Sequence, residues 1–149
     1  MKLEDICNRT LVTATPEESV VEAARRMRDE HVGCVVVLDG GHRPLGVLTD
    51  RDIVVAVVAL DLEAADIAIG DVMSAPAVNV RSSQSVEEAL ETMRGAGVRR
   101  LPLVNADGTL IGLVSADDLI ERLAGACADL ARIVVREQRR ERETRRIKV

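Results

Sequence analysis

The chain of 149 residues contains no Phe, Tyr or Trp. No aromatic ring can therefore stack on a bound base, so a purine ligand would have to lie between aliphatic side chains and backbone. Proteins that bind single-stranded nucleic acid usually stack bases on aromatic side chains, so the same absence argues against that function.

Cysteine and long apolar runs are also scarce. The cysteines Cys7, Cys34 and Cys127 form no CxxC pair and are odd in number, which argues against structural disulfides and a zinc site. The longest wholly apolar run, residues 53–60, is far shorter than a membrane span. The N-terminus shows no signal-peptide pattern. We therefore expect a cytoplasmic location with reduced thiols.

Charge is unevenly distributed along the chain. The net charge is −5, but residues 132–149 carry eight basic and three acidic residues, which leaves the rest of the chain strongly acidic. Alternating Arg and Glu is typical of a solvated helix or a frayed end. The alternative is that the tail is an interaction helix, which would bind a second copy of the chain, an acidic partner or nucleic acid.

An internal repeat runs through most of the sequence at a constant offset of 66 residues. Identical residues fall on one another without a gap, in both apolar and turn positions. The pairs include Val12 and Val78, Ser19 and Ser85, Val20 and Val86, Ala23 and Ala89, Met27 and Met93, Gly46 and Gly112, and Asp52 and Asp118. The repeat predicts two copies of one structural unit.

The first copy predicts a helix, two strands and a second helix. The first helix is expected to begin at residues 15–18, with Thr15 as its N-cap. Apolar residues at helical spacing follow, and Gly33 is expected to end the helix. Residues 34–38 and 45–49 are expected to be strands joined by a turn. A helix is expected over residues 50–60.

The second copy predicts the same order. We expect a helix near residues 83–95, strands at 100–104 and 110–115, and a helix from Ala116 that extends into the tail. Residues 61–71 link the copies and are expected to include a short helical piece. The predicted fold is α+β, with two α-β-β-α repeats packed face to face about a pseudo-twofold axis that creates two related clefts.

A Gly-x-x-[Ser/Thr]-x-x-Asp segment lies at the same strand-to-helix junction in both copies. Its polar residues are Thr49 and Asp52 in the first copy, and Ser115 and Asp118 in the second. Gly46 and Gly112 are expected to let a ligand approach the backbone. The hydroxyl at a helix N-terminus favours a phosphate, and the Asp could bind both ribose hydroxyls. A capping box gives the same pattern without any ligand, and the two interpretations are compatible.

These segments resemble the CBS-domain family, whose members occur in tandem pairs. The resemblance rests on "GVLTDRDIV", "GLVSADDLI", "VRRLPLVNADG" and "IGDVMSAPAV" and covers residues from about 6 to 124. It divides the chain into repeat one (1–62), a linker (63–71), repeat two (72–126) and a charged C-terminal helix or tail (127–149).

The resemblance implies two ligand sites, each built from both repeats. The first combines residues of the first junction with residues of repeat two: Gly46, Thr49, Arg51, Asp52, Val78, Val86, Arg99, Arg100 and Pro102. The second combines Gly112, Ser115 and Asp118 with Val12, Thr15, Val20, Gly33 and Cys34. Because a strand alternates, only one of Arg99 and Arg100 is expected to point into the first cleft, the alternative being a solvated strand end.

The expected function is a non-catalytic sensor that binds AMP, ADP, ATP or S-adenosylmethionine as a regulatory ligand and signals to a partner. The Asp52 site is expected to prefer a phosphorylated ligand because of its arginines. The Asp118 site would bind less tightly or stay empty.

No nucleophile–base pair or metal cluster accompanies the carboxylates, so no enzyme or cofactor is expected. A homodimer is typical of the family. The alternative is an interaction protein with vestigial sites that acts through its basic tail.

Overall fold

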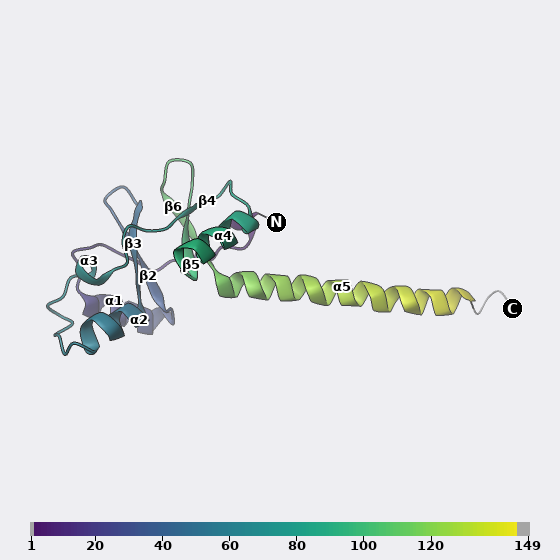
Figure 1. Cartoon of the computed structure of the whole chain (residues 1–149), viewed down its shortest axis with the longest axis horizontal. Helices are drawn as coiled ribbons and strands as arrows, with labels where there is room; N and C mark the ends of the chain where they lie inside the picture. Colours follow the sequence, from purple (N-terminus) through teal and green to yellow (C-terminus); the bar gives the residue numbers. More distant parts are fainter. Residues whose placement is uncertain (1, 146–149) are drawn as a thin grey trace. The chain divides into compact units, whose positions relative to one another are not determined.

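The computed structural model describes residues 2–145 and has a mixed α and β architecture with two similar halves (Figure 1). The chain divides into two compact units, Met1–Ser115 and Ala116–Val149, and the first contains the strands of both repeats. Arg146 and Lys148, part of the basic tail, lie outside the described residues.

Each half contains one three-stranded sheet. The first sheet has the order β1 (Thr13–Ala14), β2 (Cys34–Leu38) and β3 (Pro44–Thr49), and the second has β4 (Val80–Arg81), β5 (Arg100–Val104) and β6 (Leu110–Ser115). In both sheets the first pair is parallel and the second antiparallel. The strands β1 and β4 were not predicted, because two residues carry no alternation.

The helices α1 (Val20–Glu30) and α4 (Val86–Ala96) pack against β2 and β5 of their own repeats. Both begin after a serine that forms a capping box with a glutamate: Ser19 with Glu22, and Ser85 with Glu88. The predicted starts at residues 15 and 83 were therefore wrong. The predicted end at Gly33 was wrong as well, because His31 closes α1 in the left-handed region at φ 54°.

The remaining helices are short except for the last. They are η1 (Leu3–Asp5), α2 (Asp50–Ile53), the π-helical η2 (Val54–Val58), α3 (Ile69–Val72) and α5 (Ala116–Arg145). The helix predicted over 50–60 is thus a single α-turn that continues as a π-helix. The short helical piece predicted between the repeats is α3, and α5 does extend into the tail.

Repeat one and the linker after it share a core made of aliphatic and methionine side chains. It consists of Ala14, Ala23, Met27, Val35, Val37, Leu48 and Ile69. The equivalent methionine of repeat two, Met93, is 6% exposed, so both methionines fill the core.

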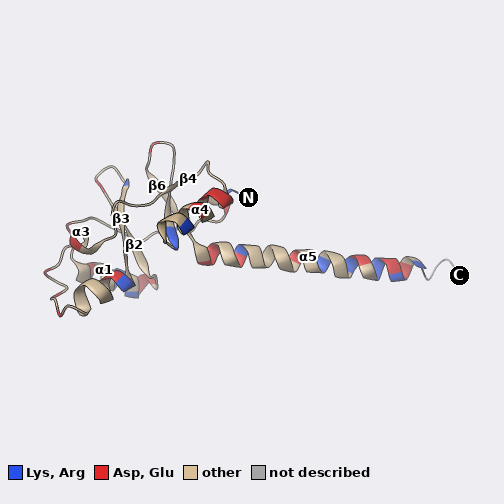
Figure 2. Ribbon diagram, viewed as in Figure 1, with Lys and Arg blue, Asp and Glu red and all other residues tan. Residues whose placement is uncertain are grey.

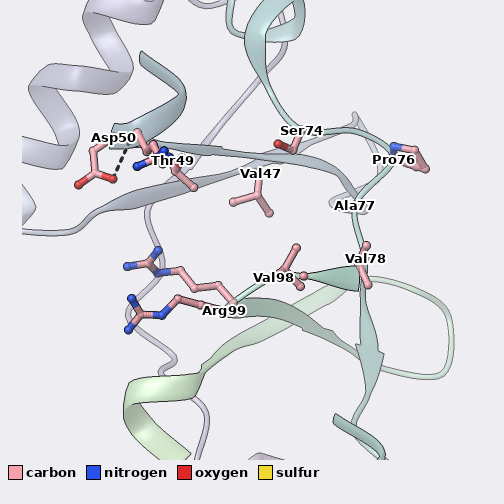
Figure 3. A pocket seen from close by; sticks show the side chains of 12 residues that line it. Val47, Thr49, Asp50, Ser74, Pro76, Ala77, Val78, Val98 and Arg99 are labelled. Carbon is pink, nitrogen blue, oxygen red and sulfur yellow. Dashed lines mark hydrogen bonds between the residues drawn. The ribbon is translucent and has the colours of Figure 1, made fainter. Parts of the chain in front are cut away.

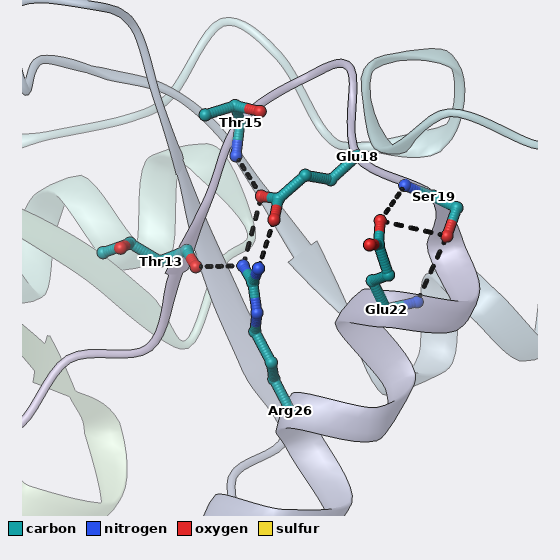
Figure 4. Close-up of polar contacts among 6 residues, drawn as sticks. All are labelled: Thr13, Thr15, Glu18, Ser19, Glu22 and Arg26. Atoms are coloured by element: carbon teal, nitrogen blue, oxygen red, sulfur yellow. Dashed lines mark hydrogen bonds and ion pairs between the residues drawn. The ribbon is translucent and has the colours of Figure 1, made fainter.

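One ion pair ties α1 to the chain before it (Figure 4). Arg26 donates to both carboxylate oxygens of Glu18 and, at 2.7 Å, to the carbonyl oxygen of Thr13. Glu18 also accepts the Thr15 N–H at 2.7 Å. The Arg26 hydrogen bond lowers the pKa of Glu18, against the opposing effect of partial burial. Residues 15–18 are therefore a fixed turn and not the first turn of α1.

The entry segment of each repeat pairs with the sheet of the other repeat. Asn8 exchanges two backbone hydrogen bonds with Leu113 of β6, at 2.8 and 3.0 Å. Ser74, which lies 66 residues later, exchanges two with Val47 of β3, both at 3.0 Å. This reciprocal exchange brings the start of repeat two alongside the strand-to-helix junction of repeat one.

Candidate ligand-binding site

A cavity of about 510 Å³ lies at this junction and is lined by both repeats. Figure 3 shows its lining from close by. The lining residues are Val47, Thr49, Asp50, Arg51, Ser74, Pro76, Ala77, Val78, Gly97, Val98, Arg99 and Arg100. Five of these were predicted for the first ligand site: Thr49, Arg51, Val78, Arg99 and Arg100.

The lining separates an aliphatic part from a polar part (Figure 3). Val47 on β3 and Val98 before β5 come from opposite sides of the cavity, and Val78 lies further along. Arg99 extends toward the side on which Thr49 and Asp50 lie. The cavity therefore offers apolar walls of the kind expected for a purine without aromatic stacking, beside positive charge for an anion.

Both arginines line the cavity, which corrects the expectation that only one would do so. Strand β5 begins at Arg100, so Arg99 lies in the bend before the strand, where side chains do not alternate. Together with Arg51 they make three arginines among the lining residues. This charge arrangement suits a phosphate, which arginine binds through charge-assisted hydrogen bonds.

Thr49 and Asp52 form a capping box at the start of α2. The Thr49 hydroxyl accepts the Asp52 N–H at 3.1 Å, and the Asp52 carboxylate accepts the Thr49 N–H at 2.9 Å. The capping interpretation of the motif is thus confirmed in the first copy. Asp52 does not contribute to the cavity lining, whereas Asp50, two residues earlier, does.

Gly46 and Gly112 are needed for the packing of the chain on itself. A Cβ at Gly46 would lie 2.7 Å from the Ser74 carbonyl oxygen, and one at Gly112 would lie 2.7 Å from Cys7 Sγ. Each glycine thus admits the entry segment of the other repeat. The chain itself fills the space beside each glycine, and close approach of a ligand at these two positions stays a prediction.

Gly33 and Cys34 lie near the first cavity, although they were predicted for the second site. A Cβ at Gly33 would be 3.3 Å from an Arg100 nitrogen and 3.3 Å from an Asp50 oxygen. Cys34 is 6% exposed. Burial raises the pKa of its thiol, with Arg100 lowering it and Asp50 raising it. The thiol is therefore a buried core group, and its part in the second site stays a prediction.

Three predicted site residues are buried. Val20 is completely buried and Val86 is 9% exposed, because each is the first residue of a helix whose apolar face packs inward. Pro102 is buried within β5. The contact of these three residues with a ligand stays a prediction.

The other residues of the second predicted site are distributed over both units. Val12, Thr15, Gly112 and Ser115 belong to the first unit, whereas Asp118 lies in the first turn of α5 in the second. The Asp118 site therefore stays a prediction.

Seven residues of the lining were missed by sequence reasoning: Val47, Asp50, Ser74, Pro76, Ala77, Gly97 and Val98. Ser74, Pro76 and Ala77 belong to the recognised segment "IGDVMSAPAV". This segment pairs with β3 through Ser74 and through the Ala77 N–H, which donates to the Leu45 carbonyl oxygen at 2.9 Å. No pattern in the neighbouring sequence predicts this pairing.

Among residues 2–145, no three His, Cys, Asp or Glu side chains are placed to hold a metal ion. A search of the same residues finds no helix with the length and apolarity that a membrane span requires. His31 and His42 are both exposed.

Comparison with known proteins identifies the class. The family model described as CBS domain matches residues 3–59 and again 69–125. The chain belongs to the CBS-domain family and carries a tandem pair of its domains, an arrangement that forms a regulatory module.

Several relatives share this architecture. An uncharacterised protein of Methanopyrus kandleri is 35% identical over 117 residues, which is 78% of this chain but only 60% of that protein. The structure of a candidate signal-transduction protein with CBS domains from Burkholderia ambifaria matches with a TM-score of 0.75 and 29% identity, over 83% of this chain and 93% of that one. A CBS domain protein from Pyrobaculum aerophilum complexed with AMP matches with a TM-score of 0.73 and 27% identity, over 80% and 90%.

Proposed function

We propose that this CBS pair is a sensor of adenine nucleotides, with AMP, ADP or ATP bound in the cavity between Thr49 and Arg100. The observation that carries the proposal is the lining itself, in which aliphatic walls from both repeats adjoin three arginines. Its volume of about 510 Å³ lies within the usual range of small-molecule sites, roughly 300–1,000 Å³. The AMP complex of the Pyrobaculum aerophilum relative supports the same ligand class.

Each part of the nucleotide has a matching surface. The base lies between the side chains of Val47, Val78 and Val98, and the phosphate meets the arginines. The ribose lies at the Thr49–Asp52 turn. Ligand binding across the repeats shifts their relative position, and a regulated partner responds to that difference.

Calorimetric titration with AMP and with adenosine tests this assignment. Replacing both Arg99 and Arg100 by Ala should weaken AMP binding about 10–100-fold, the usual worth of hydrogen bonds to a charged group. Adenosine, which lacks the phosphate, should bind both proteins equally. Arg94→Ala, which removes an exposed arginine near the end of α4, is the matched control and should bind AMP like the unchanged protein. If neither compound binds the folded protein, the proposal is wrong.

The Asp118 site is the weaker of the two in this proposal, because its predicted residues include no arginine. Asp118→Asn should therefore leave the tightest AMP-binding event unchanged. Loss of that event in Asp118→Asn would show that the order of the two sites is reversed.

The proposal includes a pairing of two modules. Helix η2 exposes Val54, Val55 and Val58 by 55–64%, a surface that is costly to leave in water. In a Leu123→Glu and Leu130→Glu background, which places charge on exposed apolar positions of helix α5 so that only η2 can contribute to association, the double variant Val55→Glu and Val58→Glu should halve the mass measured by sedimentation equilibrium. An unchanged mass would exclude this surface as the contact.

A further inference from the structure

Helix α5 carries an apolar stripe along most of its length. Ile120, Leu123, Cys127, Leu130 and Val134 are spaced three and four residues apart, so they lie on one face of the helix. Every described residue from 120 to 145 is exposed, and the four aliphatic members of the stripe are between 51% and 64% exposed. The stripe spans about 21 Å at 1.5 Å per residue.

This spacing is that of the buried seam of a two-stranded coiled coil. An exposed helix gains little stability from its own hydrogen bonds in water, and most of its stability comes from burying an apolar face. An apolar seam of two heptads is a surface that a second helix covers. The matching partner must carry a stripe of the same length.

The charges of α5 show which partner fits. Its beginning is acidic, with Asp117, Asp118 and Glu121, whereas residues 136–145 carry five arginines against three glutamates. Figure 2 shows these charged residues toward the two ends of α5, with a mostly uncharged stretch between them. A second copy of α5 running in the opposite direction places acidic end beside basic end, and the two helix dipoles oppose each other.

The opposite arrangement is electrostatically unfavourable. In a parallel pair, each acidic beginning would lie beside the other. Glu137 and Glu141, which continue the spacing of the stripe, would each face the same residue of the other copy. We propose that α5 pairs antiparallel with α5 of a second copy of this chain, with Leu123 of one copy level with Val134 of the other and Cys127 level with Leu130.

This inference is independent of nucleotide binding. Disulfide trapping in the full-length chain tests it with two single-cysteine changes made separately in a Cys127→Ala background, Leu123→Cys and Val134→Cys. Each protein is oxidised alone and as an equal mixture, and the linked peptides are identified by mass spectrometry. Both positions are exposed, so neither change disturbs the folded domains.

We expect most of the linked product in the mixture, as a bond between residue 123 of one copy and residue 134 of the other. The control mixture of Leu123→Cys with Arg132→Cys, a position on the opposite face of α5, should lose this product. Linkage of each variant with itself would show parallel pairing and overturn the proposal. No linkage in any sample would show that the stripe is covered by the chain's own domains or by a different protein, which overturns it as well.

Discussion

Replacing Gly46 by Ala tests the reciprocal packing of the two repeats. The added Cβ would lie 2.7 Å from the Ser74 carbonyl oxygen and 2.8 Å from the sulfur of Met73. The sulfur belongs to a flexible side chain and can move, but the carbonyl oxygen accepts the Val47 N–H at 3.0 Å as part of the pairing with β3. Relief of the clash therefore weakens that pairing.

The expected loss can be worked out from these contacts. Overpacking a tight site costs about 1–3 kcal/mol, and a weakened backbone hydrogen bond adds up to about 1 kcal/mol. The smaller entropy of unfolded Ala offsets about 0.4–1 kcal/mol, since Gly46 has no positive φ that Ala would have to avoid. We expect Gly46→Ala to lower the free energy of unfolding by about 2 kcal/mol.

Gly95→Ala is the matched control, because nothing lies within 4 Å of a Cβ at Gly95 in helix α4. It should stabilise the protein by about 0.5–1 kcal/mol through helix propensity. Urea unfolding followed by far-UV circular dichroism measures both, since the chain has no tryptophan for fluorescence. If Gly46→Ala were as stable as the unchanged protein but lost AMP binding, the glycine would serve the ligand and the packing argument would be refuted.

Two further predictions concern single side chains. Glu18→Gln should lower the free energy of unfolding by about 1 kcal/mol near neutral pH, because Arg26 loses a charged partner in a partly exposed pair. Since the folded pKa of Glu18 lies below its ordinary 4.5, this contribution is present above that value and lost as the pH falls through the lowered pKa. If the urea midpoints of Glu18→Gln and the unchanged protein differed as much in strong acid as near neutral pH, this explanation would be contradicted. Cys34, which is buried, should react with a thiol reagent at least about tenfold more slowly in the folded protein than in protein unfolded by urea, and equal rates would exclude the burial described for Cys34.

The repeat made much of the fold predictable. Residues 34–38, 100–104 and 110–115 are strands at the predicted bounds, because apolar runs and turn residues recur in both copies. The start of α1 was mispredicted because Thr15 and Ser19 both precede a suitable glutamate. The choice between them depends on Arg26, which binds Glu18 from a later turn of α1.

The site was predictable only in part, through the resemblance to CBS domains. That resemblance implied that Thr49, Arg99 and Arg100 lie near one another, and the structure brings them into one cavity. Ser74 and Ala77 could not be placed, because their position depends on a pairing with β3 across about thirty residues of chain. Such pairing depends on the assembled fold and not on local spacing.

The central claim is that the cavity shared by the repeats binds an adenine nucleotide. Titration of AMP into protein with isotopically labelled valine methyl groups, followed by NMR, tests it most directly. We expect the largest shifts at Val47, Val78 and Val98, which line the cavity, and little change at Val135 on α5. Unchanged valine signals at saturating AMP, or shifts confined to residues outside the cavity, would contradict it.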